Sequence, residues 1–416
     1  MTNFFLTTPE RSARTLRTHT ILHLDLDAFY CTVEEQREPA LRGTAFAVGG
    51  AADGRGVVAS CSYEARRFGV RSAMPMARAR ILCPHLLCLP TDFSAYRAAS
   101  AQVMDRLRAL TPRLEQISID EAFLDVTDLP EPGITLARRL QTQIHTELGL
   151  ACSLGIAANK LVAKIATDVG KGAVTSGRSP QAICEVPPGT EAAFLAPLPA
   201  SALWGVGPKT EEKLAELGLH TIGDIARWPE EDLRRRFGRH GEGLALHAWG
   251  VDERELTTDR EAKSVSKETT FARDITDGEA LKQTLRDQVG TVCKQLKKEG
   301  VGGTTVRLKI RWPDFVTVTR QLSVASSTVD ESVLWPLALR LLDQVWPVGQ
   351  PVRLLGFGVG GLEVPSQLSL WDTGPAEAAA AEAAKEQRVQ KALAAVTARL
   401  GPNTVRRMSQ LRPNAK

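Results

Sequence analysis

An apolar pattern is interrupted by two adjacent acids in ISIDEAFLD, residues Ile117–Asp125. The alternation at Ile117 and Ile119, followed by three apolar residues after the acids, predicts a β-strand. Two neighbouring carboxylates beside buried side chains repel each other unless cations lie between them, so Asp120 and Glu121 suggest metal binding. The alternative is a strand end whose acids face water, and this stretch alone leaves both interpretations open.

A second apolar stretch with acids at its end lies nearly a hundred residues earlier, in ILHLDLDAFY, residues 21–30. Two such strands side by side would bring Asp25 to Asp120 and Glu121. Three carboxylates can hold two Mg²⁺ ions about 3.5–4 Å apart, where one lowers the pKa of an attacking hydroxyl and the other neutralises a leaving pyrophosphate. This geometry is typical of nucleotidyl transfer.

Four blocks in order give the chain a resemblance to a known family. They are DLDAFY at 25–30, SYEARRFGVRSAMP at 62–75, SIDEAF at 118–123 and NKLVAKIATDVGK at 159–171. These blocks are similar to the signature blocks of Y-family DNA polymerases. Within that family the chain most resembles the bacterial lesion-bypass members, from about residue 18 to residue 371.

The resemblance implies an α+β, multi-domain, right-hand polymerase fold with a palm, small fingers, a thumb and a little finger domain. Strands separated by helices, with acids at strand ends, also fit an α+β palm. The expected divisions are a disordered leader at 1–17, the palm at 18–38 and 91–178, the fingers at 39–90, a helix-hairpin-helix thumb at 179–250, a linker at 251–262, an α+β little finger at 263–362, a clamp-binding peptide at 363–375, and an Ala-rich linker and helical tail at 376–416.

Length and composition constrain the fold and the function less tightly than these motifs do. With 416 residues, of which 43% are hydrophobic and 24% charged, it is long enough for several domains. The net charge is only +4, so an argument for nucleic-acid binding has to come from local charge. Seven cysteines without a CxxC pair favour a reducing compartment and no structural zinc. We find no membrane-crossing run and no signal-peptide pattern, and expect a cytoplasmic protein and, from the resemblance, a monomer.

The resemblance implies that Asp25, Asp120 and Glu121 hold the metals, with the Leu26 carbonyl as a further ligand. It also implies nucleotide contacts from Phe29 and Tyr30, and it places Tyr30 where a bulky ring excludes a 2′-hydroxyl, the steric gate. The alternative for Tyr30 is a core aromatic at a strand end.

The incoming triphosphate is expected, by the same resemblance, to contact Ser60, Tyr63, Arg66 and Lys171. Arginine suits this role because its planar fork makes paired, charge-assisted hydrogen bonds. The alternative for Arg66-Arg67 is a solvated helix face, which we prefer for Arg67.

The resemblance leads to further expectations for the block at 159–171 and for the residues that would lie over the new base pair. Lys171 is followed by Gly172, where the family usually has proline. Lys160 and Lys164 share one face of the helix before it and are interpreted as ordinary surface lysines. Ala59 and the small or flexible side chains at 72–74 occupy the family's roof over the new base pair and suggest low fidelity.

Two further regions suggest DNA binding. The run LWGVGPKT, residues 203–210, looks like a helix-hairpin-helix, in which glycines let backbone N–H groups approach a phosphate. We assign DNA contacts there to Gly205, Gly207 and Lys209. In the expected little finger, the alternating stretch 306–312 turns three cations to one face of a sheet, which a phosphate backbone would explain. A charge-blunted edge strand is the alternative. The DNA contacts expected there are Lys263, Ser264, Arg307, Lys309 and Arg311.

The peptide QLSLW, residues 367–371, follows the last expected domain. A glutamine, spaced leucines and an aromatic residue can fill a small apolar pocket on a partner. The peptide resembles the bacterial sliding-clamp-binding motif, with Trp371 where phenylalanine is commoner. Its expected contacts are Gln367, Leu368, Leu370 and Trp371, and the alternative is a plain linker.

The sequence therefore predicts a DNA-directed DNA polymerase of low fidelity that inserts dNTPs opposite damaged template bases. The expected cofactor is Mg²⁺, with two ions per site, and the expected partners are primer-template DNA, dNTPs and the sliding clamp. There are two rival interpretations. A nucleotide cyclase also uses two metals on a related palm, but the hairpin thumb and clamp peptide argue against it. A clamp-bound scaffold without chemistry would have no reason to keep all three acids.

Overall fold

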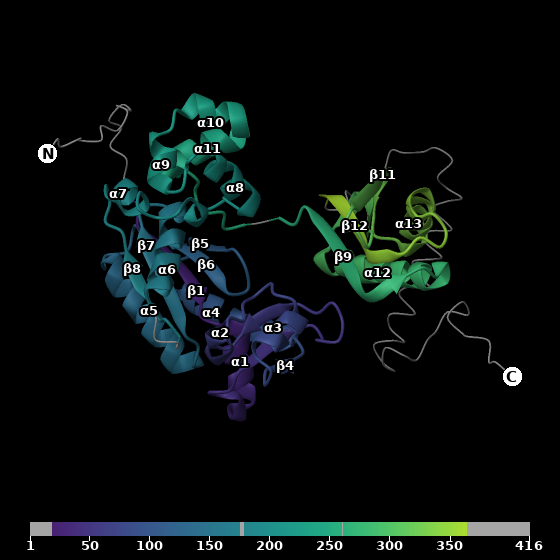
Figure 1. Ribbon diagram of the computed structural model, residues 1–416, viewed down its shortest axis with the longest axis horizontal. Helices are drawn as coiled ribbons and strands as arrows, with labels where there is room; N and C mark the ends of the chain where they lie inside the picture. Colours follow the sequence, from purple (N-terminus) through teal and green to yellow (C-terminus); the bar gives the residue numbers. More distant parts are fainter. Residues whose placement is uncertain (1–18, 175–178, 260, 364–416) are drawn as a thin grey trace, which may run out of the picture.

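The computed structural model describes residues 19–174, 179–259 and 261–363 (Figure 1). The predicted leader, clamp-binding peptide and tail lie outside these residues. Within them the chain forms a mixed palm, a small fingers module, a helical thumb and a separate little finger (Figure 1). No helix in the described ranges combines the length and apolar character that a membrane crossing requires.

The palm is built on a five-stranded sheet in the order β5-β6-β1-β7-β8. Its strands are β1 (Ile21–Leu26), β5 (Leu114–Gln116), β6 (Glu121–Asp125), β7 (Cys152–Ala157) and β8 (Ile183–Glu185). Strand β1 lies at the centre and pairs antiparallel with both β6 and β7. Strand β8 pairs parallel with β7, so the sheet extends past the palm limit at residue 178 that we expected from sequence.

Both faces of the palm sheet are covered. The helices α4 (Phe93–Leu110) and α5 (Gly133–Leu148) share one core with Leu22, Leu24 and Leu26 of β1. Helix α6 (Lys160–Ala173) packs on the other face, in a core that it shares with Phe123 and with the thumb. It approaches β7 so closely that a Cβ on Gly155 would lie 2.0 Å from the carbonyl oxygen of Ala163.

The acidic stretch differs from the single strand that its alternation predicted. Strand β5 ends at Gln116, residues 117–120 form a turn, and β6 begins at Glu121. The hydroxyl of Ser118 accepts hydrogen bonds from the backbone N–H groups of Asp120 and Glu121, at 3.2 and 3.0 Å. This side-chain hydrogen bonding closes a hairpin where the apolar alternation by itself favoured continued strand.

The fingers contain a three-stranded sheet in the order β3-β2-β4, from β2 (Phe46–Gly49), β3 (Val58–Cys61) and β4 (Leu87–Leu89). The short helix α2 (Tyr63–Arg67) follows β3 directly, and Ser62 caps it by accepting from the N–H of Ala65. Helix α3 (Met76–Leu82) completes the module, and helix α1 (Phe29–Arg37) connects it to the palm.

The thumb contains five short helices: α7 (Glu191–Leu195), α8 (Pro208–Glu216), α9 (Ile222–Arg227), α10 (Glu230–Phe237) and α11 (Arg239–Ala248). The segment after α11 was predicted to be a linker, but its first half is fixed to the core. Asp252 accepts a hydrogen bond from the Leu161 N–H at 3.1 Å, and the Arg254 guanidinium lies 4.6 Å from the Trp204 ring centroid. The N–H of Thr257 donates to Glu115 at 3.0 Å.

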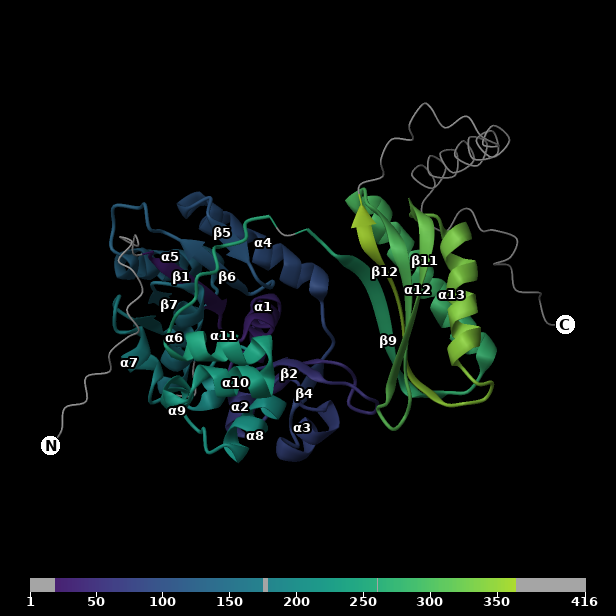
Figure 2. The ribbon, with the colours of Figure 1, turned by 90° about the horizontal axis from the view of Figure 1, so that it is seen from above.

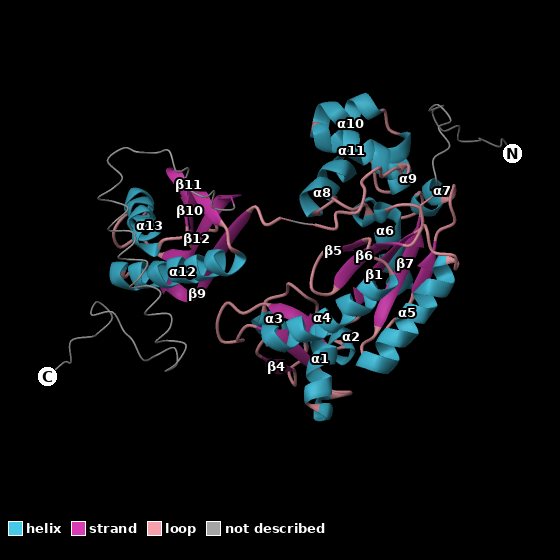
Figure 3. Cartoon of the chain, turned by 180° about the vertical axis from the view of Figure 1, so that it is seen from behind, coloured by secondary structure: helices cyan, strands magenta, loops and turns pink. Residues whose placement is uncertain are grey.

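The little finger has a four-stranded sheet in the order β11-β10-β12-β9. Its strands are β9 (Ser264–Ile275), β10 (Gly302–Arg311), β11 (Thr317–Thr328) and β12 (Val352–Glu363). Helices α12 (Gly278–Glu299) and α13 (Glu331–Val345) cover one face, on the side away from the palm (Figures 2 and 3). Arg55 of the fingers reaches this domain, 2.7 Å from Asp274 and 3.1 Å from the Phe271 carbonyl.

Candidate active site and nucleic-acid interface

A cavity of about 690 Å³ lies between the palm and the fingers and collects most of the predicted metal-binding and nucleotide-binding residues. From the palm, the cavity is lined by β1, by the turn after β1 and by the end of α6. From the fingers, it is lined by the end of β3 and by α2. The predicted residues in the lining are Asp25, Leu26, Phe29, Tyr30, Ala59, Ser60, Tyr63, Arg66, Ser72, Asp120 and Lys171. Segments more than a hundred residues apart in sequence therefore meet at one surface.

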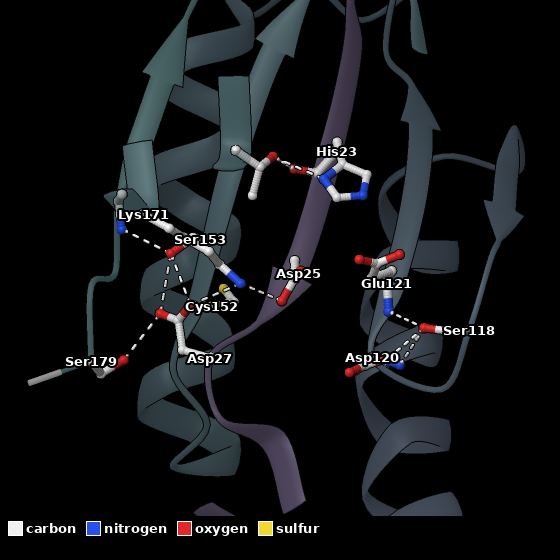
Figure 4. A network of polar contacts seen from close by, with 12 residues as sticks. His23, Asp25, Asp27, Ser118, Asp120, Glu121, Cys152, Ser153, Lys171 and Ser179 are labelled. Atoms are coloured by element: carbon white, nitrogen blue, oxygen red, sulfur yellow. Dashed lines mark hydrogen bonds and ion pairs between the residues drawn. The ribbon is translucent and has the colours of Figure 1, made fainter. Parts of the chain in front are cut away.

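The three predicted metal ligands come from adjacent strands. Asp25 and Glu121 are paired residues in the β1–β6 register, so their side chains lie on the same face, as expected. Asp120 lies one residue earlier, in the turn, and its carboxylate accepts a hydrogen bond from the Ser118 hydroxyl (Figure 4). Glu121 is held 2.8 Å from the ammonium of Lys164 and does not itself line the cavity.

Asp25 is half enclosed and pairs with the Lys171 ammonium (Figure 4). Burial is the largest influence on this carboxyl and raises its pKa to about 7, with the Glu121 charge acting in the same direction and Lys171 opposing both. For Lys171, burial alone would lower the pKa, but the charges of Asp25 and Asp27 outweigh it and raise the pKa. The site therefore combines acids that repel one another with lysines that offset their charge.

The three acids are the candidate ligands of this site for a divalent cation. In the described ranges, no three His, Cys, Asp or Glu side chains converge closely enough to hold a metal ion. Two lysines are instead ion-paired with the acids, Lys164 with Glu121 and Lys171 with Asp25. Hard carboxylate oxygens are the ligands that Mg²⁺ prefers, and lysine ammonium groups at the same oxygens mark them as cation-binding. The donor atoms therefore match a divalent cation in type, while Lys164 and Lys171 balance the charge of Glu121 and Asp25.

The aromatic residues after Asp27 form a stack at the cavity wall. The Tyr30 ring lies parallel to that of Tyr96, with centroids 4.3 Å apart, and Phe93 meets its edge at 6.1 Å. Burial, followed by the charge of Asp120, raises the pKa of Tyr30. Phe29 is 3% exposed and belongs mainly to the palm core. Tyr30 therefore presents a supported, neutral ring to the cavity.

The fingers side of the cavity is cationic. The Arg66 guanidinium lies 4.6 Å from the Tyr63 ring centroid, and its Nε donates to the Cys61 carbonyl at 3.3 Å. Burial is the main cause that raises the pKa of Tyr63, with the charge of Asp27 adding to it. Arg67 is exposed, as our preference for a solvated face predicted, and it also lines the cavity together with Arg71.

Sequence reasoning missed residues that support the site from behind. Asp27 is buried and holds Lys171, and its only signal was its place as the second acid of DLDAFY. His23 is buried between β1 and α6, with Nδ1 2.8 Å from the Thr167 hydroxyl; burial lowers its pKa well below the usual value. Lys160 is 5% exposed and pairs with Glu115 at 2.8 Å, so our interpretation of it as an ordinary surface lysine was wrong.

In the thumb, the predicted hairpin residues lie before and at the start of α8. Gly205 has a φ of +100°, a conformation that side chains rarely adopt, and Gly207 is the residue before the helix. Lys209 is exposed in the first turn of α8. A second hairpin joins α10 to α11 at Gly238, and a Cβ on Gly241 would lie 2.0 Å from the Leu233 carbonyl oxygen. The geometry of the first hairpin fits the phosphate-binding role expected of it.

The face of the little finger sheet opposite the helices carries the predicted cations. Residues 306, 308 and 310 are buried beneath α12 and α13, and Arg307, Lys309 and Arg311 alternate with them on the other face, as expected. Lys309 is not an isolated cation, because it reaches across β12 to Glu268 of β9 at 2.7 Å.

Glycine in β12 makes this contact possible. Gly356 lies between Lys309 and Glu268 in the sheet register, and a Cβ there would lie 2.9 Å from Cγ of Glu268. Together with Gly356, Gly358 and Gly360 form a strip of residues without side chains along β12. This glycine strip is the floor of a groove of about 300 Å³ between β10 and β9. The groove walls include Ser264 and Arg307. A polar groove with a cationic side suits a phosphate backbone.

Comparisons with known proteins agree with this architecture. The impB/mucB/samB family matches residues 24–168, its C-terminal domain matches residues 262–370, and the IMS family HHH motif matches residues 188–219. DNA polymerase IV of Streptomyces coelicolor is 43% identical over 358 residues, 85% of this chain and 73% of that protein. DNA polymerase IV of Desulfatibacillum aliphaticivorans is 40% identical over 388 residues, 92% of this chain and 95% of that protein.

Among solved structures, a Y-family DNA polymerase chimera is similar in fold. It has a TM-score of 0.73 and 24% sequence identity, and the match covers 83% of this chain and 99% of the chimera. The palm, thumb and little finger observed here correspond in order to the three matched family regions. The chain therefore belongs to the impB/mucB/samB family, the Y-family of DNA polymerases.

Proposed function

We propose that this DNA-directed DNA polymerase extends a primer opposite damaged or distorted template bases, with low fidelity, at the cavity between palm and fingers. In the reaction, the primer 3′-hydroxyl attacks the α-phosphate of an incoming dNTP, and pyrophosphate leaves. One observation carries the proposal. Asp25 and Asp120 on the palm side of the cavity face Tyr63 and Arg66 on the fingers side, so carboxylates lie opposite phosphate-binding groups.

The metal ligands in this proposal are Asp25, Asp120 and Glu121, with the Leu26 carbonyl. Two Mg²⁺ ions held there would lower the pKa of the 3′-hydroxyl and neutralise the charge on the leaving pyrophosphate. Arg66, Tyr63 and Lys171 would donate hydrogen bonds to the triphosphate, with Ser60 beside them. Tyr30 would exclude a 2′-hydroxyl from the sugar position.

Low fidelity is supported by the size of the residues above the cavity. Ala59 and Ser72 line it, and neither side chain is large enough to clamp a base pair. Small side chains above the base pair discriminate weakly between correct and incorrect base-pair shapes. The site would therefore accept distorted template bases as well as mismatches. The seven free cysteines, five of them buried, support the cytoplasmic location expected from sequence.

Three surfaces would hold the DNA. The thumb hairpin at Gly205, Gly207 and Lys209 would contact duplex phosphates, as would the little finger face around Arg307 and Lys309. Lys263, Ser264 and Arg311 would extend that face. We further propose that residues 367–371, outside the described part of the chain, tether the enzyme to the sliding clamp, because the peptide directly follows the last domain.

Replacing Glu121 with alanine should abolish primer extension, by roughly 10²–10³-fold or more, because one ligand that stabilises transition-state charge is lost. Extension of a defined primer with Mg²⁺ and four dNTPs measures this, alongside DNA binding by fluorescence anisotropy. Glu185→Ala, which removes an exposed carboxylate from the far edge strand of the same sheet, serves as the control. Full extension by Glu121→Ala would remove the metal site from the proposal.

Replacing Tyr30 with alanine should raise ribonucleotide insertion relative to deoxynucleotide insertion by roughly tenfold or more, since the clash with the 2′-hydroxyl is lost. The ratio of kcat/KM values for a dNTP and the matching rNTP reports the change. Phe93→Ala is the matched control, because Phe93 contacts the outer edge of the Tyr30 ring and does not line the cavity. An unchanged ratio in Tyr30→Ala would rule out the gate role.

The double charge reversal Arg307→Glu, Lys309→Glu should weaken DNA binding and reduce the magnitude of the salt slope, d log K/d log[salt], by about one, because Arg307 is expected to neutralise a phosphate whereas Glu268 already offsets Lys309. Titration of primer-template DNA at several salt concentrations measures it. Lys297→Glu, Lys298→Glu on α12, which covers the opposite face, is the control of equal charge change. Lys209→Glu tests the thumb in the same titration, and an unaltered slope in either variant would exclude that surface.

Replacing Leu370 and Trp371 with alanine should bring primer extension with the sliding clamp down to the level measured without the clamp. The apolar residues are expected to fill the partner's pocket, so their loss removes the tether. Val389→Ala, Leu393→Ala in the tail, an equal loss of apolar side chains, should keep the stimulation. If stimulation persisted without Leu370 and Trp371, the peptide would be a linker.

A further inference from the structure

Asp27 is the most enclosed carboxylate near the cavity, with the residue 1% exposed. Three groups besides a cation hold it, through four hydrogen-bond contacts. The Ser153 hydroxyl donates to its two oxygens at 3.0 and 3.1 Å, and the Ser179 hydroxyl and the Gln181 N–H each donate at 3.0 Å. A carboxylate with this many donors is held in one orientation, because each donor would be left unpaired if it rotated.

The cation is Lys171. Its ammonium lies 3.3 Å from Asp27 and also pairs with Asp25, so it bridges the two acids of DLDAFY (Figure 4). The two acids differ in their access to the cavity. Asp25 lines the cavity, whereas Asp27 lies behind it and does not. Lys171 therefore has one partner that is expected to bind a divalent cation and one partner that is fixed in the protein.

This arrangement makes Lys171 and a divalent cation competitors for Asp25. A cation that binds Asp25 displaces the ammonium, and a lysine displaced into a partly buried site without a partner is costly. Asp27 provides that partner, and its three other donors prevent it from following the ammonium or the metal. Lys171 then stays at the cavity wall, where Tyr63 and Arg66 face it.

We propose that Asp27 is a positioning residue that retains Lys171 when Asp25 exchanges the lysine for a divalent cation, and so keeps Lys171 in place for the triphosphate. This inference rests on the proposed function, because it takes Asp25 as a metal ligand and Lys171 as a phosphate contact. Asp27 touches neither the metal nor the nucleotide in this account and acts only through Lys171.

A merely structural role for Asp27 would have different consequences. The carboxylate also connects β7 to residues 179–181, because Ser153 and Gln181 both donate to it. Loss of that connection alone would lower the stability of the fold without a selective effect on cation or nucleotide binding. Divalent-cation affinity and the separate changes in KM and kcat distinguish the two roles.

The test uses the full chain with Asp27→Asn, which keeps the size of the side chain and removes its charge. Mn²⁺ binding to the DNA-free protein is measured by calorimetry, and KM and kcat for a dNTP are measured by primer extension. We expect Mn²⁺ to bind about tenfold more weakly, the usual scale for losing a group that supports a metal site from behind. The KM for the dNTP should rise by about the same factor, with a smaller change in kcat.

The matched control is Asp125→Asn. Asp125 also ends a palm strand and is buried, and it accepts from the Thr127 N–H at 2.9 Å and lies 3.3 Å from Arg113, but it does not contact Lys171. We expect its Mn²⁺ affinity and KM to match the wild type. Wild-type values in Asp27→Asn, or equal shifts in both variants, would overturn the inference.

Two further variants keep the result interpretable. If Asp27→Asn does not fold, Ser179→Ala removes one hydrogen bond to Asp27 without changing its charge, and should raise the KM about threefold; no change there would overturn the inference. Asp25→Asn tests the proposed function separately. If Asp25→Asn binds Mn²⁺ as tightly as the wild type, the proposed metal site is wrong. If Asp25→Asn loses Mn²⁺ binding but Asp27→Asn keeps it, only the role of Asp27 is rejected.

Discussion

The central constraint on this protein is the repulsion among carboxylates that the palm sheet gathers at one end. Pairing of β1 with β6 sets Asp25 beside Glu121, and the turn before β6 adds Asp120. Such a group is stable only with positive charge nearby. Helix α6 supplies it, because Lys164 and Lys171 project from one helix toward the two paired acids. The position of α6 is therefore as important to the site as the acids are.

The residues packed beneath α6 hold this helix, and so its lysines, close to the acids. Gly155 allows the helix to lie directly against β7, and His23 contacts the Thr167 side chain from β1. His23 is neutral because burial lowers its pKa, so it adds no charge to a site that already has several. Asp27, held by three donors and Lys171, fixes the end of the same helix. The core of the palm thus sets the electrostatics of the cavity.

The domains that surround the palm differ in how firmly they are attached. The thumb shares a core with α6, and the segment after it is fixed through Asp252 and Thr257 as far as residue 257. The little finger has its own core and meets the fingers through Arg55. The sheet face that we propose for DNA is less cationic than its sequence suggested, because Glu268 neutralises Lys309 across a strip of glycines.

The sequence by itself determined the family, the order of the domains and many of the residues that line the cavity, because short motifs and apolar periodicity record local chemistry. It also predicted the alternation of β10. Only the tertiary structure decided which groups pair. Asp27, Lys164, Lys160 and Glu268 are ordinary charged residues in sequence, and each acquires its role from a partner at least forty residues away. The hairpin within 114–125 was missed for a different reason: hydrogen bonds to one serine side chain, which apolar periodicity does not record, ended the strand.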